Sequence, residues 1–351
     1  MSIHCSYCYA PLDRVRLCGK CNARPYCSQE CQRVDWNQHK IWCGKIANPI
    51  IDFEIRDTGG ERGMGLFALR DFEVGEKILV ERPVILTETA TSDDGISMFA
   101  HIAEQFKKAS LSIQDAIMAL HSVDPNNPME SAHVQCFGEC IRKFACNNFG
   151  TYTGGTESAL CVTASRLNHE CVPNCSRYFV PDHNLLVISA GKPISKGQEL
   201  TISYTSQGIA DGLHKFRERT MRAWGFECGC AVCTNKDLFG KLQWLQQMDE
   251  RVLELGRVGK AARVCKLCER MLKVVDELGG LPGVKQHIYY DMFQMAIGIR
   301  GKVKDATRYA ETGLEEWQHM IGGSKTEPSE VKKAQRYAEA PGSHPNYLIF
   351  S

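Results

Sequence analysis

The sequence of 351 residues lacks three features that would assign it to a special class of protein. It has no uninterrupted apolar run of about 20 residues, so we expect no membrane span. Its N-terminus, MSIHCSYCYA, lacks the apolar core of a signal peptide. Its formal net charge is only +1, so no strong overall field draws it to nucleic acid or to an acidic membrane. We therefore expect a globular protein of the cytoplasm, the nucleus or both.

Cysteine, by contrast, is abundant, with 18 residues in the chain. A short secreted protein would use so many cysteines in disulfides, but this chain is long and shows no export signal. Clustered cysteine and histidine in such a chain indicate zinc. Residues 5–43 hold seven of the cysteines and almost no aliphatic run, so this segment has too little apolar mass to form a core by itself.

The cysteines and one histidine of residues 5–43 form four closely spaced pairs. Two ligands separated by two residues can hold a metal from a tight turn, and ligands separated by three lie one above the other on a helix. Eight such ligands are enough for two tetrahedral Zn²⁺ sites. A cross-brace joins the first pair to the third and the second to the fourth. We therefore predict one zinc on Cys5, Cys8, Cys27 and Cys31, and another on Cys18, Cys21, His39 and Cys43.

With its stretches YCSQECQ and DWNQHKIWC, this segment resembles a MYND zinc finger. The resemblance implies a module that binds proline-containing peptides. Trp36 and Trp42 could stack on such a peptide or could shield the zinc ions, and the sequence does not decide between the two. Residues 1–43 contain six Lys or Arg against three Asp or Glu, an excess too mild to indicate direct DNA binding.

A second group of cysteines, Cys228, Cys230 and Cys233, supplies three thiolates, one fewer than a closed zinc site needs. Cys171, in the stretch NHEC, is the expected fourth ligand. The alternative is that Cys171 is a buried thiol and that the three thiolates are completed by Cys175. We assign the remaining spaced pairs to the core: Cys136 with Cys140, and Cys265 with Cys268.

Four blocks of the chain resemble, in order, a SET domain with its post-SET zinc motif: ERGMGLFALRDFEVGEKILVERP, NHEC, ELTISY and FECGCAVC. Together with the finger, they resemble the SET-and-MYND lysine methyltransferase family, and WGFECGC suggests a fungal-type member. This resemblance implies S-adenosyl-L-methionine as methyl donor and three Zn²⁺ ions. It also implies a protein substrate, histone or non-histone, that offers a target lysine to a monomeric enzyme.

The expected fold is α+β: an N-terminal MYND finger, a β-rich SET fold with a pseudoknot, and a helical C-terminal region. Strand-like stretches at 52–86 and 177–204 and helical periodicity at 96–145 and 236–340 agree with it. The expected domains are the finger at 1–48, the SET domain at 49–235, and a C-terminal domain of TPR-like helix pairs at 236–351. The SET part includes a helical insertion at about 90–145 and the zinc motif at 224–235. Because the finger precedes the opening strands instead of interrupting them, its docking position is not predicted.

The resemblance also assigns roles to single residues. Tyr204, which closes ELTISY, matches the catalytic tyrosine whose oxygen orients the methyl group and the lysine amine. Phe149 and Trp224 match the substrate channel, and Trp224 stands where many members have tyrosine. For Arg62 the alternative is a solvated surface charge. The expected cofactor contacts are Arg62, Gly63, Met64, Gly65, Asn147, Asn168, His169, Tyr204 and Phe226.

Two other functions remain open at this point. The chain could be a catalytically weak or inactive adaptor that recruits proline-rich partners through the finger, although intact Asn168, His169 and Tyr204 argue against a dead site. It could also methylate something other than a protein lysine, which the aromatic channel residues disfavour. The sequence does not reveal the substrate protein or the number of methyl groups transferred.

Overall fold

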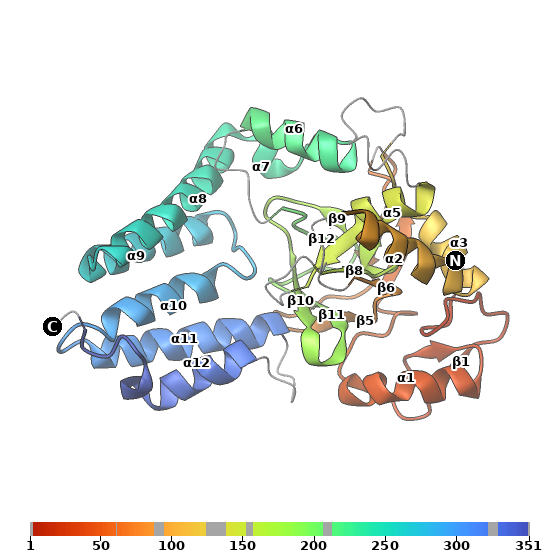
Figure 1. The fold of residues 1–351 in the computed structure, drawn as a ribbon, viewed down its shortest axis with the longest axis horizontal. Coiled ribbons are helices and arrows are strands. Elements are labelled where there is room, and N and C mark those ends of the chain that lie inside the picture. The colour runs from red at the N-terminus through yellow and green to blue at the C-terminus, as the bar shows by residue number, and fades with distance from the viewer. Residues whose placement is uncertain are drawn as a thin grey trace.

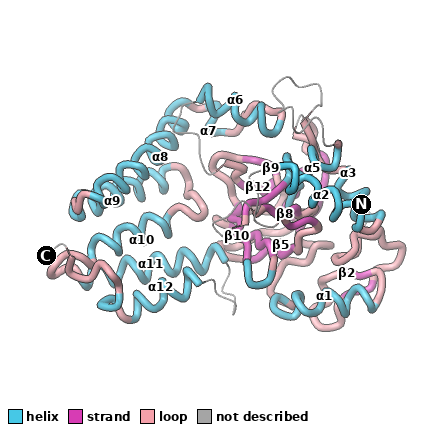
Figure 2. Tube along the Cα trace, viewed as in Figure 1, coloured by secondary structure: helices cyan, strands magenta, loops and turns pink. Residues whose placement is uncertain are grey.

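The computed structural model describes residues 3–60, 62–87, 95–123, 138–151, 157–205, 213–321 and 329–349. Part of the expected helical insertion at about 90–145, including Cys136, lies outside these residues. Small β-sheets occupy the middle of the molecule, with the N-terminal finger on one side and an arc of helices on the other (Figure 1). The strands gather in the middle of the molecule with helices around them (Figure 2), and the predicted α+β class is confirmed.

The finger is built from a two-stranded hairpin and one helix. Strand β1 (Arg16–Leu17) pairs with β2 (Pro25–Tyr26), and α1 (Gln29–Trp42) begins after Ser28, whose side chain accepts a hydrogen bond from the Cys31 amide at 3.1 Å. Positions four residues apart share one face of a helix, and this face of α1 carries Cys31, Asp35 and His39. The centre of the finger consists largely of cysteines around Tyr26, so metal ligands take the place of an apolar core.

The finger docks on strand β5 (Lys77–Glu81) of the SET region. Arg24 donates from Nη1 to the carbonyl of Val80 at 3.3 Å, and the Trp42 ring is buried against Val80 and Tyr178. Trp42 is therefore part of the interface. Of the two tryptophans considered for peptide stacking, only Trp36 keeps a partly exposed ring.

Three small sheets form the SET region. The first has the order β3 (Phe53–Asp57), β4 (Met64–Ala68), β12 (Glu199–Ile202), β9 (Asn168–His169). The second has the order β10 (Cys175–Val180), β11 (Leu185–Ala190), β5. The third has the order β6 (Ile85–Leu86), β8 (Ser158–Leu160), β7 (Asn148–Gly150). Parallel pairing of Asn168 with Thr201 and of His169 with Ile202 holds the NHEC segment beside the last strand, as the expected pseudoknot requires.

Helices flank these sheets on the side of the finger. They are α2 (Gly95–Lys108), α3 (Leu111–Met118) and α5 (Glu139–Asn147). Their apolar faces bury Ile102, Ile117 and Ile141 against Ile85 and Leu160 of the third sheet. The short turn η1 (Ala164–Arg166) connects β8 to β9. A further helix, α6 (Leu213–Trp224), leads to the cysteine-rich turn and to α7 (Ala231–Thr234).

The C-terminal region consists of helices joined by turns and ends in an irregular tail, and the helices agree with its periodicity. Its elements are α8 (Lys236–Arg257), α9 (Ala261–Glu277), α10 (Lys285–Ala296), α11 (Val303–Ile321), α12 (Ser329–Glu339) and the 3-10 turn η3 (Pro341–Ser343). They follow one another around the arc in Figure 1, and α11 reaches back to the second sheet, where Trp317 meets Tyr178 edge-on at 5.9 Å. None of the described helices has both the length and the apolar composition needed to cross a bilayer.

Candidate active site and metal centres

The predicted zinc ligands of the finger come together in two groups of four. Within each group the ligand atoms all lie within 4.8 Å of one another. In the first group the Cys27 sulfur is 3.6 Å from that of Cys8 and 3.4 Å from that of Cys31. In the second, the Cys21 sulfur lies 3.5 Å from His39 Nε2. Zinc–sulfur bonds of about 2.3 Å in a tetrahedron place sulfurs about 3.8 Å apart, so both groups fit Zn²⁺.

The third group joins the middle of the chain to residues 228–233. The Cys171 sulfur lies 4.0 Å from that of Cys228 and 3.4 Å from that of Cys233, and Cys230 completes the group within the same 4.8 Å. The alternative ligand Cys175 is buried elsewhere, with its sulfur 3.4 Å from Asn174 Oδ1. The donor set again fits a closed zinc site, so the prediction of three Zn²⁺ ions is confirmed.

His169 lies between this third group and Tyr204. Its Nδ1 accepts a hydrogen bond from the Tyr204 backbone amide at 3.0 Å, which leaves the ring proton on Nε2. Nε2 faces the Cys171 sulfur at 3.5 Å. The imidazole is 5% exposed and stacks at an angle beside Phe226, with 6.1 Å between ring centres. One buried ring therefore connects a metal ligand to the strand end that carries Tyr204.

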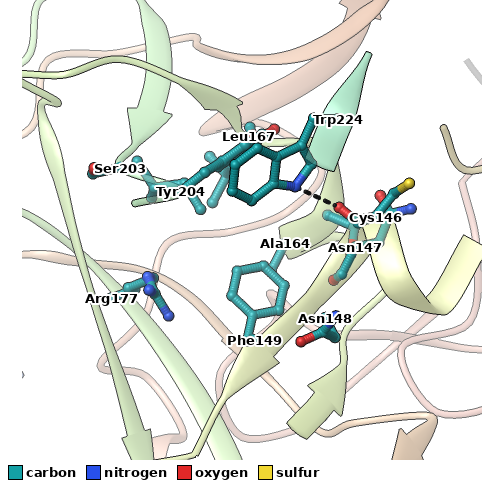
Figure 3. A pocket seen from close by; sticks show the side chains of 12 residues that line it. Cys146, Asn147, Asn148, Phe149, Ala164, Leu167, Arg177, Ser203, Tyr204 and Trp224 are labelled. Atoms are coloured by element: carbon teal, nitrogen blue, oxygen red, sulfur yellow. Dashed lines mark hydrogen bonds between the residues drawn. The ribbon is translucent and has the colours of Figure 1, made fainter. Parts of the chain in front are cut away.

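Tyr204 lines a cavity of about 40 Å³. Figure 3 shows the rings of Phe149, Tyr204 and Trp224 gathered around it, with the Arg177 side chain to one side. Trp224 lies over Tyr204 with 5.3 Å between ring centres, and its indole nitrogen donates to the carbonyl of Cys146 at 3.1 Å. Both residues predicted for the substrate channel, Phe149 and Trp224, thus meet the predicted catalytic tyrosine in one pocket.

The Tyr204 hydroxyl has a fixed orientation. It donates to the carbonyl of Leu167 at 2.7 Å. Burial raises the pKa of Tyr204 above its ordinary value of 10, so the phenol keeps its proton at neutral pH. Since that proton is committed to Leu167, the phenol oxygen can act only as an acceptor toward a group in the cavity.

Several predicted cofactor contacts converge on a carboxylate that the sequence did not single out. Glu199 accepts a hydrogen bond from the Asn168 amide at 2.7 Å and pairs with the Arg62 guanidinium at 3.1 Å. The Asn168 amide also donates to the Met64 carbonyl at 3.1 Å, and Arg62 donates to the His169 carbonyl at 3.3 Å. These contacts hold the start of β4, the NHEC segment and β12 together. We call this edge of the site, formed by Arg62, Met64, Gly65, Asn168 and Glu199, the rim.

Two protein-family models match the chain, a SET domain over residues 63–205 and a MYND finger over residues 5–43. The chain belongs to the SET-and-MYND protein-lysine methyltransferase family. It is 24% identical to mouse "Histone-lysine N-methyltransferase SMYD3", an alignment covering 91% of this chain and 74% of that protein. It is 27% identical to bovine "N-lysine methyltransferase SMYD2", over 67% of this chain and 51% of that protein.

Among solved structures, the SET domain of LSMT bound to lysine and AdoHcy aligns with 88% of this chain and 91% of that one. Its TM-score of 0.33 and identity of 9% are too low to support an argument about this site.

The SET-and-MYND family uses S-adenosyl-L-methionine, and the residues along the rim fit this cofactor. A Cβ atom added at Gly65 would lie 2.6 Å from Glu199 Oε1 and 3.1 Å from Asn168 Nδ2, so only glycine allows the polar side chains to approach the strand. Met64 beside it is 41% exposed. Open backbone, polar groups of both charges and the partly exposed Phe226 ring suit a ligand with a charged amino-acid end and an adenine ring.

Two predicted cofactor residues, Gly63 and Asn147, form local hydrogen bonds with the backbone. Gly63 lies in the β3–β4 turn with φ +66°, a conformation that favours glycine, and its carbonyl accepts from the Thr58 amide at 2.9 Å. Asn147 lines the cavity, but its side-chain amide donates at 2.7 Å to the carbonyls of His121 and Lys143. Those bonds give Asn147 a structural role at the end of α5, and its cofactor contact stays a prediction.

Sequence reasoning missed Glu199 and Arg177 in this SET-and-MYND site. Glu199 opens the stretch ELTISY, and a carboxylate at the start of a strand, two residues after the turn at Gly197, was the available signal. Arg177 belongs to β10, and its guanidinium lies 5.9 Å from the centre of the Phe149 ring. No local pattern reveals Arg177, because its place at the cavity depends on how the second sheet packs against β7.

Proposed function

We propose that this chain transfers a methyl group from S-adenosyl-L-methionine to a lysine side chain of a histone or non-histone protein, with Tyr204 as the catalytic residue. The observation that carries the proposal is the oriented Tyr204 hydroxyl at a small cavity with Phe149 and Trp224 on its walls. Bovine SMYD2 is named as an N-lysine methyltransferase and mouse SMYD3 as a histone-lysine one, which supports both classes of acceptor.

The residues of the cavity favour the reactive form of a lysine. S-adenosyl-L-methionine supplies an electrophilic methyl group, and the attacking amine must be neutral and aligned with it. The aromatic walls of Phe149 and Trp224 exclude water, which disfavours an ammonium ion. Burial therefore lowers the pKa of a lysine amine that enters.

Tyr204 then orients the amine. Its hydroxyl hydrogen is held by Leu167, so its oxygen presents a lone pair to an N–H group and can align the nitrogen. His169 fixes the Tyr204 backbone from the other side. The phenol is thus held at both ends before substrate arrives, which is the kind of preorganisation that accelerates a transfer.

The remaining assignments follow from position. For the cofactor we propose the backbone and side chains of Arg62, Gly63, Met64, Gly65, Asn147, Asn168, His169 and Phe226. At the finger, we propose that Trp36 stacks on a proline-containing peptide, since Trp42 is buried. We further propose a monomer that works in the cytoplasm or the nucleus without direct DNA contact.

A labelling experiment tests this function. Wild type and Tyr204→Phe are incubated with a tritiated methyl donor and a proteome whose endogenous enzymes have been inactivated, and labelled bands are analysed for methyl-lysine by mass spectrometry. Tyr290→Phe is the matched control, because Tyr290 lines a separate cavity of about 20 Å³ between α10 and α11.

We expect wild type and Tyr290→Phe to label the same proteins on lysine. Tyr204→Phe should bind the cofactor nearly as well but transfer methyl groups at least about 100-fold more slowly. Undiminished labelling by Tyr204→Phe would remove Tyr204 from the mechanism, and label found on groups other than lysine would contradict the proposed acceptor.

A further inference from the structure

In addition to the Arg24–Val80 bond and the buried Trp42, a buried hydrogen-bonded pair of side chains joins the MYND finger to the SET region. The Tyr9 hydroxyl of the finger donates to Oε1 of Glu81 on β5. Tyr9 follows the ligand Cys8 directly, and its amide donates to the carbonyl of Cys5 at 3.0 Å, so the first metal turn sets its position. Glu81 is only 5% exposed. A carboxylate buried this deeply is unfavourable unless it is fully hydrogen-bonded, so Glu81 needs further donors besides Tyr9.

The other partners of Glu81 are backbone amides at the start of η1. Oε1 accepts from the Thr163 amide and Oε2 from the Ala164 amide, both at 2.8 Å. Burial raises the pKa of Glu81, and the Tyr9 hydroxyl and the two amides oppose that shift. One carboxylate thus joins the finger to the turn that leads into the NHEC segment.

This turn forms a wall of the methyl-transfer cavity. Ala164, Ser165 and Leu167 line the cavity beside Tyr204. The Leu167 amide donates to the Ala164 carbonyl at 3.0 Å, and the Leu167 carbonyl accepts the Tyr204 hydroxyl at 2.7 Å. The path from finger to phenol is therefore continuous: a hydroxyl, a carboxylate, one short turn and a carbonyl.

We propose that Tyr9 and Glu81 are positioning residues for methyl transfer, holding η1 so that the Leu167 carbonyl orients the Tyr204 hydroxyl. The zinc finger then serves the reaction directly, in addition to any peptide it binds. This inference rests on the proposed catalytic role of Tyr204. Docking of the finger has other support, because Arg24 bonds the Val80 carbonyl and Trp42 is buried at the interface. Loss of the Tyr9 hydroxyl should therefore move the turn without releasing the finger.

The test compares two tyrosines of the same finger. Tyr9→Phe removes the hydroxyl and keeps the ring. Tyr7→Phe is the same chemical change two residues away, where the Tyr7 ring packs under the Arg82 guanidinium, 4.8 Å from its centre, across the same interface. For each variant, zinc content, cofactor Kd, and kcat and KM per cofactor-binding site are measured well below the unfolding temperature.

We expect Tyr9→Phe to lower kcat about tenfold with three zinc ions and an unchanged cofactor Kd, while Tyr7→Phe stays at wild-type kcat. Single-turnover rates in Tyr204→Phe and Tyr9→Phe/Tyr204→Phe complete a double-mutant cycle. If Tyr9 acts through the phenol, Tyr9→Phe has little further effect once the Tyr204 hydroxyl is absent.

Unchanged kcat in Tyr9→Phe, an equal loss in Tyr7→Phe, or full additivity in the cycle would each overturn the coupling. Should Tyr9→Phe lose zinc, Glu81→Gln provides the same test from outside the finger, and wild-type turnover in that variant overturns the proposal. The catalytic assignment fails separately: full turnover in Tyr204→Phe overturns it and the coupling together, whereas a slow Tyr204→Phe beside a normal Tyr9→Phe overturns the coupling alone.

Discussion

Cys171→Ala should remove one zinc ion and loosen the cofactor wall, whereas Cys175→Ala should do neither. The two cysteines lie four positions apart and both are buried. Only Cys171 belongs to the third ligand group, with its sulfur 3.4 Å from that of Cys233. Alanine at either position removes the same atom, so a difference between the variants isolates the metal bond.

The expected magnitude follows from the loop that the metal closes. Cys171 and Cys228 are separated by 57 positions, and closing a loop of that length costs the chain about 4 kcal/mol. Bonds to zinc offset this cost in the native protein. Without Cys171, the Phe226 ring keeps its contacts with the rings of His169 and Tyr204, at 6.1 and 6.3 Å between centres. Such contacts contribute about 0.5–1.5 kcal/mol each, so they only partly replace the metal.

We therefore expect Cys171→Ala to contain two zinc ions per chain and to bind S-adenosyl-L-methionine about 30-fold more weakly, since about 1–3 kcal/mol of the closure cost is no longer offset. Elemental analysis and titration calorimetry measure the two quantities. Cys175→Ala should keep three zinc ions and a cofactor Kd close to wild type, with a loss of stability of about 1 kcal/mol for the small void. Three zinc ions and wild-type affinity in Cys171→Ala would refute the idea that this metal builds the cofactor wall.

Two further substitutions test the rim and the C-terminal helices. Gly65→Ala should weaken cofactor binding about tenfold in a calorimetric titration, because its Cβ would lie 2.6 Å from Glu199 Oε1, while Gly60→Ala, with nothing within 4 Å of its added Cβ, should leave binding unchanged. Equal cofactor affinities in the two variants would show that Glu199 can move away from the added Cβ without weakening cofactor binding. Burial, helped by the nearby Asp249 charge, raises the pKa of Asp291 from 3.8 to about 6. Above pH 6 the native state therefore carries an unfavourable charge on Asp291, and this charge is neutralised as the pH falls. Asp291→Asn should raise stability in urea titrations by about 1 kcal/mol at pH 7.5, a value discounted for partial exposure from an upper limit of about 3. The gain should shrink to roughly half by pH 5, and a gain that does not change with pH would contradict this origin.

The metal sites and the helices were predictable because their signals are local. A zinc ion needs four soft ligands at fixed distances, and the spacing of Cys5, Cys8, Cys27 and Cys31 leaves few ways to satisfy that need. The C-terminal helices α8 to α11 follow apolar residues at helical period, which also depends only on near neighbours. Membership of the SET-and-MYND family followed from the order of short motifs.

The contacts that shape the cavity were not predictable, because they join distant parts of the chain. Glu81 meets Tyr9 across 72 positions and the Thr163 amide across 82. Glu81 lies in the first SET-like block and Tyr9 in the finger, but no spacing in either segment points to a contact between them, and a glutamate at the end of a strand is usually solvated. The docking of the finger was open for the same reason. It depends on the fit of Trp42 against Val80, which no spacing along the sequence encodes.

The order of residues in NHEC is explained by the two faces of an extended segment. Successive side chains of such a segment point to opposite sides. His169 and Cys171 are buried and turn toward the third metal group, while Asn168 and Glu170 are only partly buried. Asn168 bonds Glu199, and the Arg62 charge acts to lower the pKa of Glu170, which burial raises, so this second face looks onto the rim.

Alternation thus lets four consecutive residues serve two sites at once. Because the metal fixes the inner face, the outer face is held in the register that the rim requires, and an insertion of one residue would exchange the two faces. The bond from the Tyr204 amide to His169 extends the same register to the phenol. The metal, the rim and the catalytic tyrosine are therefore coupled by strand geometry. A change that weakens the metal group should also alter the position of the Tyr204 hydroxyl.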